Sequence, residues 1–390
     1  MMNKRIKKDL HNSIPEKLTL NEEKKQTILA AAHRRMNSET PRKKHRLAPI
    51  LASVAVIGLA GFLAFSYLQS DKEQSATPVQ SVVPQPEVVT HQQQVVVDHV
   101  EYSQLIDSIY LDETDELIYT DSHDIFSNSM ETLTTKRLAQ GTGDVIAGVT
   151  LSANEQWISW ESGGLIHVLN RETGETQDIS DHLGMQQVAG DTLLYLSVQK
   201  NIAVMQLGLH TKELHLVHEY EGKGDQQSYT VYEDQAVFSE QLSDQGKPYT
   251  KFTLYDLNTR AEIGTYSIPY SEIGKVELQN DRIYAEVSAD GDAYTLGYID
   301  MKEGKFNKLD VPQHFDYAVH GEWLALSVPD TTSDTVKAFK LEGDKAVVQT
   351  YLQDIKERLV KPRFTERGTL VLNSEDALHS MHLLHTQTLE

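Results

Sequence analysis

Histidine is the side chain of this 390-residue protein that most readily suggests chemistry, because six of its histidines gather in two short stretches. The two trios are His210, His215 and His218, and His379, His382 and His385. Imidazole nitrogens hold transition metals or move protons near neutral pH. Both stretches are typical of strands, in which residues three apart point to opposite faces. We therefore expect surface histidines and no metal site.

Acidic runs and enzyme motifs are the next candidates. The runs LDETDE (111–116) and SADGD (288–292) lack the ligand spacing of a calcium loop, so we expect solvated hairpin turns. G-x-S-x-G, H-E-x-x-H, phosphate-loop and dinucleotide-binding motifs are absent from the sequence. Trp157 and Trp160 should lie on opposite faces of one strand, and we expect one of them to pack between blades rather than to stack on a ligand. These observations predict no catalytic residue, no cofactor and no enzymatic activity.

A repeat organises the larger part of the chain. A strand end, a short turn of Asp, Asn, Glu or Gly, and an apolar strand recur at spacings of 36 to 47 residues. The anchor residues of this unit are Ile118, Ile158, Leu194, Val237, Ile283, Leu324 and Val371. A second hairpin follows most anchors, and two hairpins supply the four strands of a propeller blade. The pattern predicts an all-β, seven-bladed β-propeller, with six or eight blades as alternatives.

The last unit predicts how the ring closes. Its sequence, TLVLNSEDALHSMHLLHTQTLE, supplies two or three strands before the chain stops at Glu390. An incomplete blade leaves N–H and C=O groups of a strand edge unpaired, and propellers avoid this by borrowing a strand from the other terminus. We expect the β-branched residues 94–100 to pair with the strand around Met381–His385.

Two elements of the repeat resemble TolB-type propellers. The stretch LSANEQWISW (151–160) is similar to their S-P-D-G-x-x-[IL]-[AV]-[FYW] turn and strand, although the Pro and Gly are missing. Residues 168–174 and 255–259 resemble the Y-x-[LI]-[DN]-x-x-T-G element. The resemblance extends over residues 99–390 and implies a TolB-like or WD40-like fold. Such propellers include enzymes, receptors and scaffolds, so the fold alone does not determine function.

A membrane span is predicted upstream of the repeat. Residues 47–68 form a run of 22 without a charge. As a helix they would extend about 33 Å, enough to cross a hydrocarbon core of about 30 Å. Cleavable signal peptides usually have an apolar region of only about 7–15 residues, close to the N-terminus. The run begins after Arg42, Lys43, Lys44 and Arg46. We therefore expect a retained signal anchor.

Charge predicts the orientation. Residues 1–46 contain 13 Lys and Arg against 5 Asp and Glu, whereas residues 69–390 contain 23 against 52. The positive-inside rule then predicts a cytoplasmic N-terminus and an extracytoplasmic propeller at 94–390. Residues 69–93, rich in Gln, Pro, Ser and Val, predict a flexible linker. An acidic ectodomain does not favour nucleic acid as a partner. The absence of cysteine from the sequence excludes disulfides, which favours a Gram-positive bacterial surface.

The cytoplasmic segment predicts one helix, about 19–36. Thr19 and Glu22 form a capping box at its start. An apolar face made of Ile28, Leu29, Ala32 and Met36 follows. So short a helix has little apolar surface to bury by itself, and it is expected to lie on membrane lipid or to bind in the groove of a partner protein.

The layout and the segment IPEKLTLNEEKK (14–25) resemble membrane-bound anti-sigma factors of Gram-positive bacteria. That resemblance implies a cytoplasmic sigma factor as partner and a sensory ectodomain that binds a protein or a cell-wall ligand. The His-x-x-x-Cys-x-x-Cys motif of the zinc-binding subgroup is absent, since the chain has no cysteine. One alternative is a membrane-anchored scaffold propeller without signalling. A less favoured alternative is an extracytoplasmic hydrolase or lyase, which would need His, Asp and Arg converging at the blade tops.

Overall fold

The computed structural model describes residues 90–96, 108–121, 123–141, 151–198, 201–221, 228–289, 293–329, 335–375 and 380–386. These residues all belong to one unit, Pro84–Glu390. In the part of the chain that the structure describes, no helix is long and apolar enough to cross a membrane. The predicted helix at 19–36, the span at 47–68 and the linker up to residue 89 lie outside the described residues.

The described residues form seven antiparallel sheets of four strands each. The strands of each blade are given from the inner to the outer one. Blade 1 contains β2 (Ile109–Leu111), β3 (Glu116–Thr120), β4 (Asp124–Ser129) and β5 (Thr135–Gln140), and blade 2 contains β6 (Ser152–Ala153), β7 (Trp157–Ser162), β8 (Leu165–Asn170) and β9 (Thr176–Ile179). Blade 3 contains β10 (Gly184–Ala189), β11 (Thr192–Val198), β12 (Ile202–Gly208) and β13 (Leu214–Glu219), and blade 4 contains β14 (Ser228–Tyr232), β15 (Gln235–Asp244), β16 (Lys247–Asp256) and β17 (Ala261–Ile268). Blade 5 contains β18 (Glu272–Gln279), β19 (Arg282–Ser288), β20 (Thr295–Asp300) and β21 (Lys305–Lys308). Blade 6 contains β22 (Asp316–His320), β23 (Trp323–Val328), β24 (Thr335–Glu342) and β25 (Lys345–Val348). Blade 7 contains β26 (Leu359–Phe364), β27 (Thr369–Ser374), β28 (Met381–Thr386) and β1 (Thr90–Val95).

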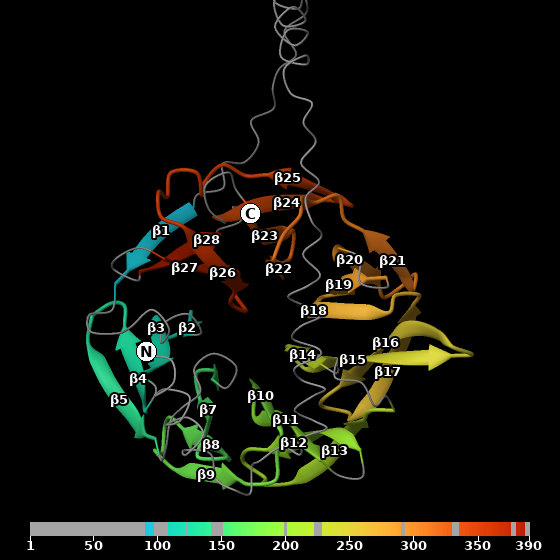
Figure 1. The fold of residues 1–390 in the computed structure, drawn as a ribbon. Coiled ribbons are helices and arrows are strands. Elements are labelled where there is room, and N and C mark those ends of the chain that lie inside the picture. Colours follow the sequence, from blue (N-terminus) through green and yellow to red (C-terminus); the bar gives the residue numbers. More distant parts are fainter. Residues whose placement is uncertain are drawn as a thin grey trace, which may run out of the picture. The chain divides into compact units, whose positions relative to one another are not determined.

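The seven sheets are arranged around a ring, with the first strand of each blade nearest the centre (Figure 1). The chain is therefore a seven-bladed β-propeller, as the repeat predicted. Every anchor residue of the repeat lies in the second strand of its blade and is at most 1% exposed. An apolar residue in that strand is buried on both faces of the sheet, between two neighbouring blades. This burial explains why the anchors recur once per blade.

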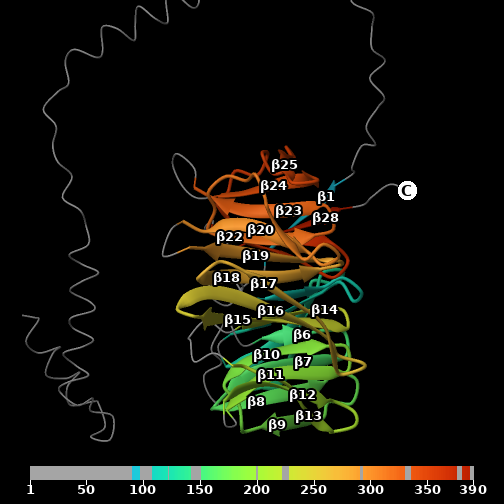
Figure 2. The ribbon, with the colours of Figure 1, turned by 90° about the vertical axis from the view of Figure 1, so that its right-hand side faces the viewer.

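Strand β1 closes the ring by completing blade 7. It pairs with β28 along its whole length, from Thr90 opposite Thr386 to Val95 opposite Met381, and the two strands lie side by side in Figures 1 and 2. The predicted closing strand is confirmed in kind, but its predicted bounds are wrong. The strand occupies 90–95 rather than 94–100, so the propeller begins before residue 94. An outer strand can have polar residues such as glutamine on its solvent-facing side. The polar run at the start of β1 therefore resembles a linker in the sequence.

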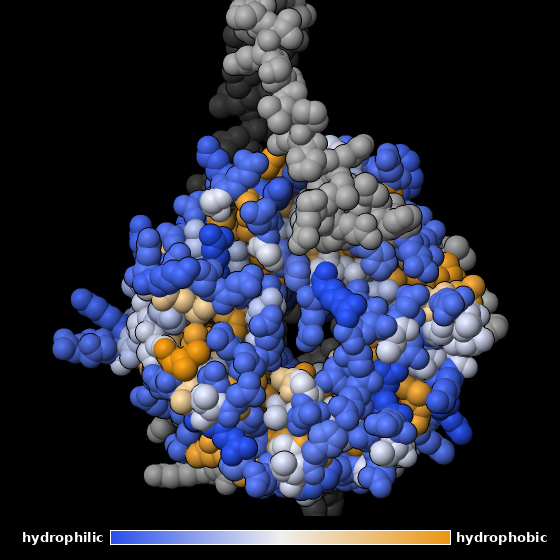
Figure 3. Space-filling model, turned by 180° about the vertical axis from the view of Figure 1, so that it is seen from behind, coloured by the Kyte–Doolittle hydropathy of each residue, from blue (hydrophilic) through white to orange (hydrophobic). Residues whose placement is uncertain are grey.

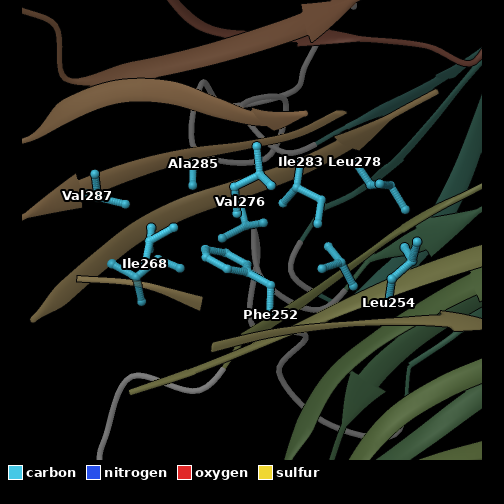
Figure 4. Close-up of a cluster of buried hydrophobic side chains, with 11 residues drawn as sticks. Phe252, Leu254, Ile268, Val276, Leu278, Ile283, Ala285 and Val287 are labelled. Atoms are coloured by element: carbon cyan, nitrogen blue, oxygen red, sulfur yellow. The ribbon is translucent and has the colours of Figure 1, made fainter. Parts of the chain in front are cut away.

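The hydrophobic core is divided among the junctions between blades. Seven clusters of buried side chains each join two neighbouring blades, including the pair that meets at the seam. In the cluster of Figure 4, Phe252 and Ile268 of blade 4 face Val276 and Ile283 of blade 5. Burying an aliphatic side chain of this size contributes about 1.5–3 kcal/mol. Trp157 and Trp160 pack in two different clusters, so both tryptophans, rather than the one expected, lie between blades.

At two of these junctions, a buried tyrosine joins the neighbouring blades by contacting a β-bulge in the inner strand of the preceding blade. The register of β10 shifts between Gly184 and Gln187, and that of β18 shifts between Ile273 and Val276. The Tyr317 hydroxyl lies within hydrogen-bond distance of the Lys275 carbonyl in the second bulge, at 3.0 Å, and of the Tyr284 carbonyl, at 3.2 Å.

The corresponding residue of blade 4 makes the same contacts. Tyr229 donates to the carbonyl oxygens of Met185, in the bulge of β10, and of Leu194. Burial raises the pKa of both Tyr229 and Tyr317 well above the ordinary value. Each hydroxyl therefore stays protonated and donates to the preceding blade.

Candidate binding face and central channel

One end of the ring, which we call the turn face, carries a carboxylate in every blade. Each blade begins with its inner strand, so the turns between first and second strands all lie at the same end of the channel. The acidic residues of these turns are Asp112, Glu113, Asp115, Glu155, Asp191, Glu233, Asp234, Asp281, Glu322 and Glu366. They are the acidic turns of the repeat, and the ring gathers them around one opening.

Cations neutralise several of these carboxylates. The Lys302 amine lies 2.7 Å from the Asp281 carboxylate, and the Lys340 amine lies 3.4 Å from that of Glu322. Arg367 pairs with Glu113 at the same end of the ring. Exposed pairs of this kind contribute at most about 1 kcal/mol each. Their main effect is to reduce the negative charge over the outer part of the turn face.

Three carboxylates near the channel have no such partner. Within the described residues, no nitrogen of lysine, arginine or histidine lies within 4.0 Å of the carboxylates of Glu155, Glu233 or Glu366. Partial burial raises the pKa of Glu366 above its ordinary value, and the charges of Glu155 and Glu233 raise it further. The charges of Glu155 and Glu233 thus act on Glu366, although burial has the larger effect. We call this group the acidic mouth.

A cavity of about 500 Å³ lies beside the acidic mouth. It is lined by the inner strands β6, β10 and β14, and both Glu233 and Glu366 reach its edge. Gln187 and Thr230 add polar groups to walls that also contain Val188. The space-filling view shows a hollow near the centre of the ring (Figure 3). The size is within the range of about 300–1,000 Å³ that is usual for pockets that bind small ligands.

The channel wall between blades 5 and 6 contains a lysine held between two acids. The Lys275 amine lies 2.9 Å from the Glu277 carboxylate and 3.1 Å from the Asp316 carboxylate. Burial alone would lower the pKa of Lys275, but the two carboxylates outweigh it and raise the pKa above the ordinary value. The amine is therefore a permanent cation at neutral pH and is unsuited to act as a base.

The arginine of the channel wall is also engaged. The Arg363 guanidinium donates to the Asn373 side chain at 2.6 Å and to the Ser108 carbonyl at 3.1 Å. Because Ser108 precedes blade 1 and Asn373 belongs to blade 7, these bonds join the two blades of the seam. In the described wall, the cations Lys275 and Arg363 hold blades together.

The predicted site residues divide into two groups. Thr19, Glu22, the face Ile28, Leu29, Ala32 and Met36, and the basic residues Arg42, Lys43, Lys44 and Arg46 lie outside the described residues. Of the histidines, His210 packs its ring edge against Trp157, and the His218 ring stacks on Phe238 at 4.8 Å. His379 lies outside the described residues. In the described part of the chain, no group of three His, Cys, Asp or Glu residues could hold a metal ion.

The expectation of surface histidines is wrong for two of them. The His382 residue is 2% exposed, and the His218 side chain is 13% exposed. Both lie on strands that contribute to the junctions between blades, where an imidazole packs like an aromatic ring. A sequence with short alternating runs does not reveal which face of an outer strand meets the next blade, so this burial could not be predicted.

Comparisons with solved structures agree with the fold. A chain of the "Mitotic Checkpoint Complex" matches with a TM-score of 0.52 and 11% identity, covering 82% of this chain and 97% of that one. The β-propeller domain of Cps50 (Swd1) from Myceliophteria thermophila matches with a TM-score of 0.51 and 11% identity, covering 76% and 100%. An oligogalacturonate lyase from Vibrio parahaemolyticus matches with a TM-score of 0.54 and 11% identity, covering 76% and 97%.

These similarities concern the fold alone, because identities this low carry no information about function. TolB from Acinetobacter baumannii superposes more loosely, with a TM-score of 0.38 and 14% identity, covering 67% of this chain and 59% of that one. No protein-family model matches the sequence, and no curated protein matches it significantly. The fold and the charged channel thus define this chain as a β-propeller with a polar central cavity.

Proposed function

We propose that this protein is a single-pass membrane regulator whose extracytoplasmic propeller binds a ligand at the acidic mouth. The observation that carries the signalling role is the capped, amphipathic segment 19–36, which a simple membrane anchor would not need. The uncharged run 47–68 and the basic residues before it support anchorage with the N-terminus in the cytoplasm. The resemblance to anti-sigma factors supports a sigma factor as the cytoplasmic partner.

The channel supports binding rather than catalysis. Its lysine is a fixed cation between Glu277 and Asp316, and its arginine joins two blades. The acidic mouth instead offers carboxylates without cationic partners beside a cavity of about 500 Å³. Carboxylates that lack a cationic partner attract a positively charged group of a ligand. The ligand that we propose is therefore an extracytoplasmic protein segment or cell-wall component that presents an amine or a guanidinium.

Crosslinking in whole cells tests the signalling role. The full-length chain should capture a cytoplasmic protein, and the double substitution Ile28→Asp with Leu29→Asp should abolish that capture, because each lost contact of a buried aliphatic is worth about 1.5–3 kcal/mol. External protease should digest the propeller and leave a membrane-embedded fragment in both proteins. If residues 1–46 capture no protein, the signalling role is wrong and the scaffold alternative takes its place.

Substitution of the acidic mouth tests the binding role separately. Replacing Glu155, Glu233 and Glu366 by Gln should abolish retention of the full-length chain on immobilised tri-lysine peptide. A matched variant replaces the paired acids Glu113, Asp281 and Glu322 by Gln and removes the same amount of charge. Equal loss of retention in both variants would show that overall charge, rather than the acidic mouth, attracts the peptide.

A further inference from the structure

Arg282 occupies an unusual place on the turn face. It opens β19, directly after the first turn of blade 5. Its guanidinium carbon lies 4.2 Å from the ring centroid of Tyr298, and its Nη1 donates to the Tyr284 hydroxyl at 3.4 Å. Both tyrosines are buried, and Arg282 is partly buried. Stacking on one ring and bonding to the other fixes the orientation of a planar, permanently charged group.

This guanidinium lacks the partner that the other arginines of the turn face have. Arg171 pairs with a carboxylate, Arg367 does so as well, and Arg260 lies 3.9 Å from one. Among the described residues, no carboxylate lies within 4.0 Å of Arg282. A guanidinium has five N–H donors, and a single donor of Arg282 is used by a side chain. Most of its donor capacity is therefore available to a ligand.

A pocket surrounds the arginine. Its volume is about 260 Å³, and it lies between blades 5 and 6, where Arg282 and Asn280 face the turn residues Gly321 and Gly343. Gln279 also lines it, and the Oε1 atom of this side chain is buried without a hydrogen-bond partner. The volume is below the range of about 300–1,000 Å³ for pockets that bind whole small molecules. It suits the end of one side chain or the terminus of a peptide.

Cations lie close to acids around the pocket. Asp281 pairs with Lys302, and Glu322 pairs with Lys340. Asp344 accepts a hydrogen bond of 2.7 Å from the Tyr298 hydroxyl, and Asp300 lies opposite Arg282 in the pairing of β19 with β20. The two lysines and the guanidinium thus offset much of the negative charge that an approaching anion would meet there.

We propose that the Arg282 pocket binds a carboxylate on a short aliphatic arm, the group that a glutamate side chain presents. A planar guanidinium accepts a carboxylate through two parallel hydrogen bonds, which is the strongest arrangement that these groups form. The pocket is separate from the acidic mouth and has the opposite preference. The inference goes beyond the proposed function and depends neither on membrane anchorage nor on the cationic ligand.

Titration of the full-length chain in detergent tests this site with N-acetyl-glutamate amide as the probe, followed by saturation-transfer NMR. We expect binding of this probe and none of N-acetyl-glutamine amide, which differs only in the lost charge. A parallel titration uses glutarate. If glutarate binds with similar affinity, free small acids rather than peptides are the source of the carboxylate.

Substitutions then locate the binding. Arg282→Gln should weaken it about tenfold or more, and Arg282→Lys should weaken it less, because a lysine keeps the charge but loses the paired hydrogen bonds. The matched control is Arg260→Gln, which removes an ion-paired arginine from the same face and should leave binding unchanged.

Chemical labelling keeps the test independent of how the variants fold. Phenylglyoxal should modify Arg282 of the wild-type chain, and the glutamate probe should slow this modification but not that of Arg260. The site is overturned if the wild-type chain does not bind the probe, if Arg282→Gln binds it as well as the wild type, or if the probe gives no protection.

Discussion

The completion of blade 7 by β1 and the junction between blades 5 and 6 hold the ring together by different means. In blade 7, the polar strand β1 is held to β28 by six backbone register pairs, and its Val95 packs in the core cluster that blade 7 shares with blade 1. At the other junction, buried side chains connect the blades through Tyr317, the Lys275 triad and a buried His314. Main-chain pairing tolerates almost any sequence, whereas side-chain connections require particular residues.

Deleting β1 should have the largest effect. Removal of residues 90–96 exposes the edge of β28 and breaks a row of backbone hydrogen bonds, each worth about 0.5–1.5 kcal/mol. We expect loss of cooperative unfolding and aggregation of the full-length chain, measured by thermal melting and light scattering. A deletion of 71–84 should melt like the intact protein. If both deletions melt alike, β1 does not carry the seam.

Breaking the lysine triad should have the next largest effect. Lys275→Met leaves the carboxylates of Glu277 and Asp316 close together in the channel wall without their cation. We expect a loss of about 1–3 kcal/mol in the free energy of unfolding, less than for a fully buried pair because the lysine side chain is 36% exposed. Urea denaturation measures it. Lys302→Met, which breaks an exposed pair, should leave the free energy of unfolding almost unchanged.

Removing a tyrosine hydroxyl should have a smaller effect. Tyr317→Phe and Tyr229→Phe each leave carbonyl groups of a bulge without their donor, at a cost of about 1–2 kcal/mol. The two losses should be similar, because the two tyrosines make equivalent contacts, and urea denaturation would reveal a difference. The exposed Tyr294 is the control, and Tyr294→Phe should leave stability unchanged. If it costs as much as the other two, the bulge contacts are not the cause.

Titration of His314 should have the smallest effect. The imidazole is 3% exposed, with the Pro312 carbonyl 3.0 Å from Nδ1 and the Glu286 carboxylate 3.2 Å from Nε2. Burial alone would lower the pKa of His314, but these two acceptors and the charge of Asp316 raise it above the ordinary value of 6.5. The protonated form is thus favoured in the folded chain, and the stabilisation is full below the ordinary pKa.

That stabilisation is lost as the pH rises through the raised pKa of the folded chain. Thermal melting between pH 5 and pH 9, a range of about four units around the histidine pKa, should show a decline in the wild type that His314→Gln lacks. The charged groups that face the imidazole are the carboxylates of Glu286 and Asp316, and both remain in His314→Gln, so the comparison isolates the histidine. Parallel curves for the two proteins would contradict the assignment.

Most of the fold could be predicted from the sequence because the second strand of every blade is buried on both faces. Burial on both faces demands apolar residues such as Ile158 and Leu324, and it leaves a signal once per blade. The closing strand could be anticipated because the last unit lacked a strand. Its bounds could not, since glutamines on an outer strand carry no apolar signal.

The sites could be predicted far less well than the fold. The acidic turns were recognised as turns, but nothing in their sequence indicates that Glu155, Glu233 and Glu366 converge on one opening. That convergence depends on the ring, which brings Glu366 close to two residues that precede it by more than a hundred positions. The Arg282 pocket is hidden for the same reason, because it lies between two blades. Bulges and their tyrosines escape detection because a register shift leaves no consistent mark in one sequence.

Pairing of Thr90 with Thr386 has a consequence for how this molecule can be cut and rejoined. The first and last described residues of the propeller are neighbours, so a short peptide could link them and new termini could be opened between any two blades. A circular permutant of this kind would keep every strand pair, and each blade, blade 7 included, would then consist of four consecutive strands. The need for a strand from the other end of the chain thus depends on where the chain is opened, not on the arrangement of the seven sheets.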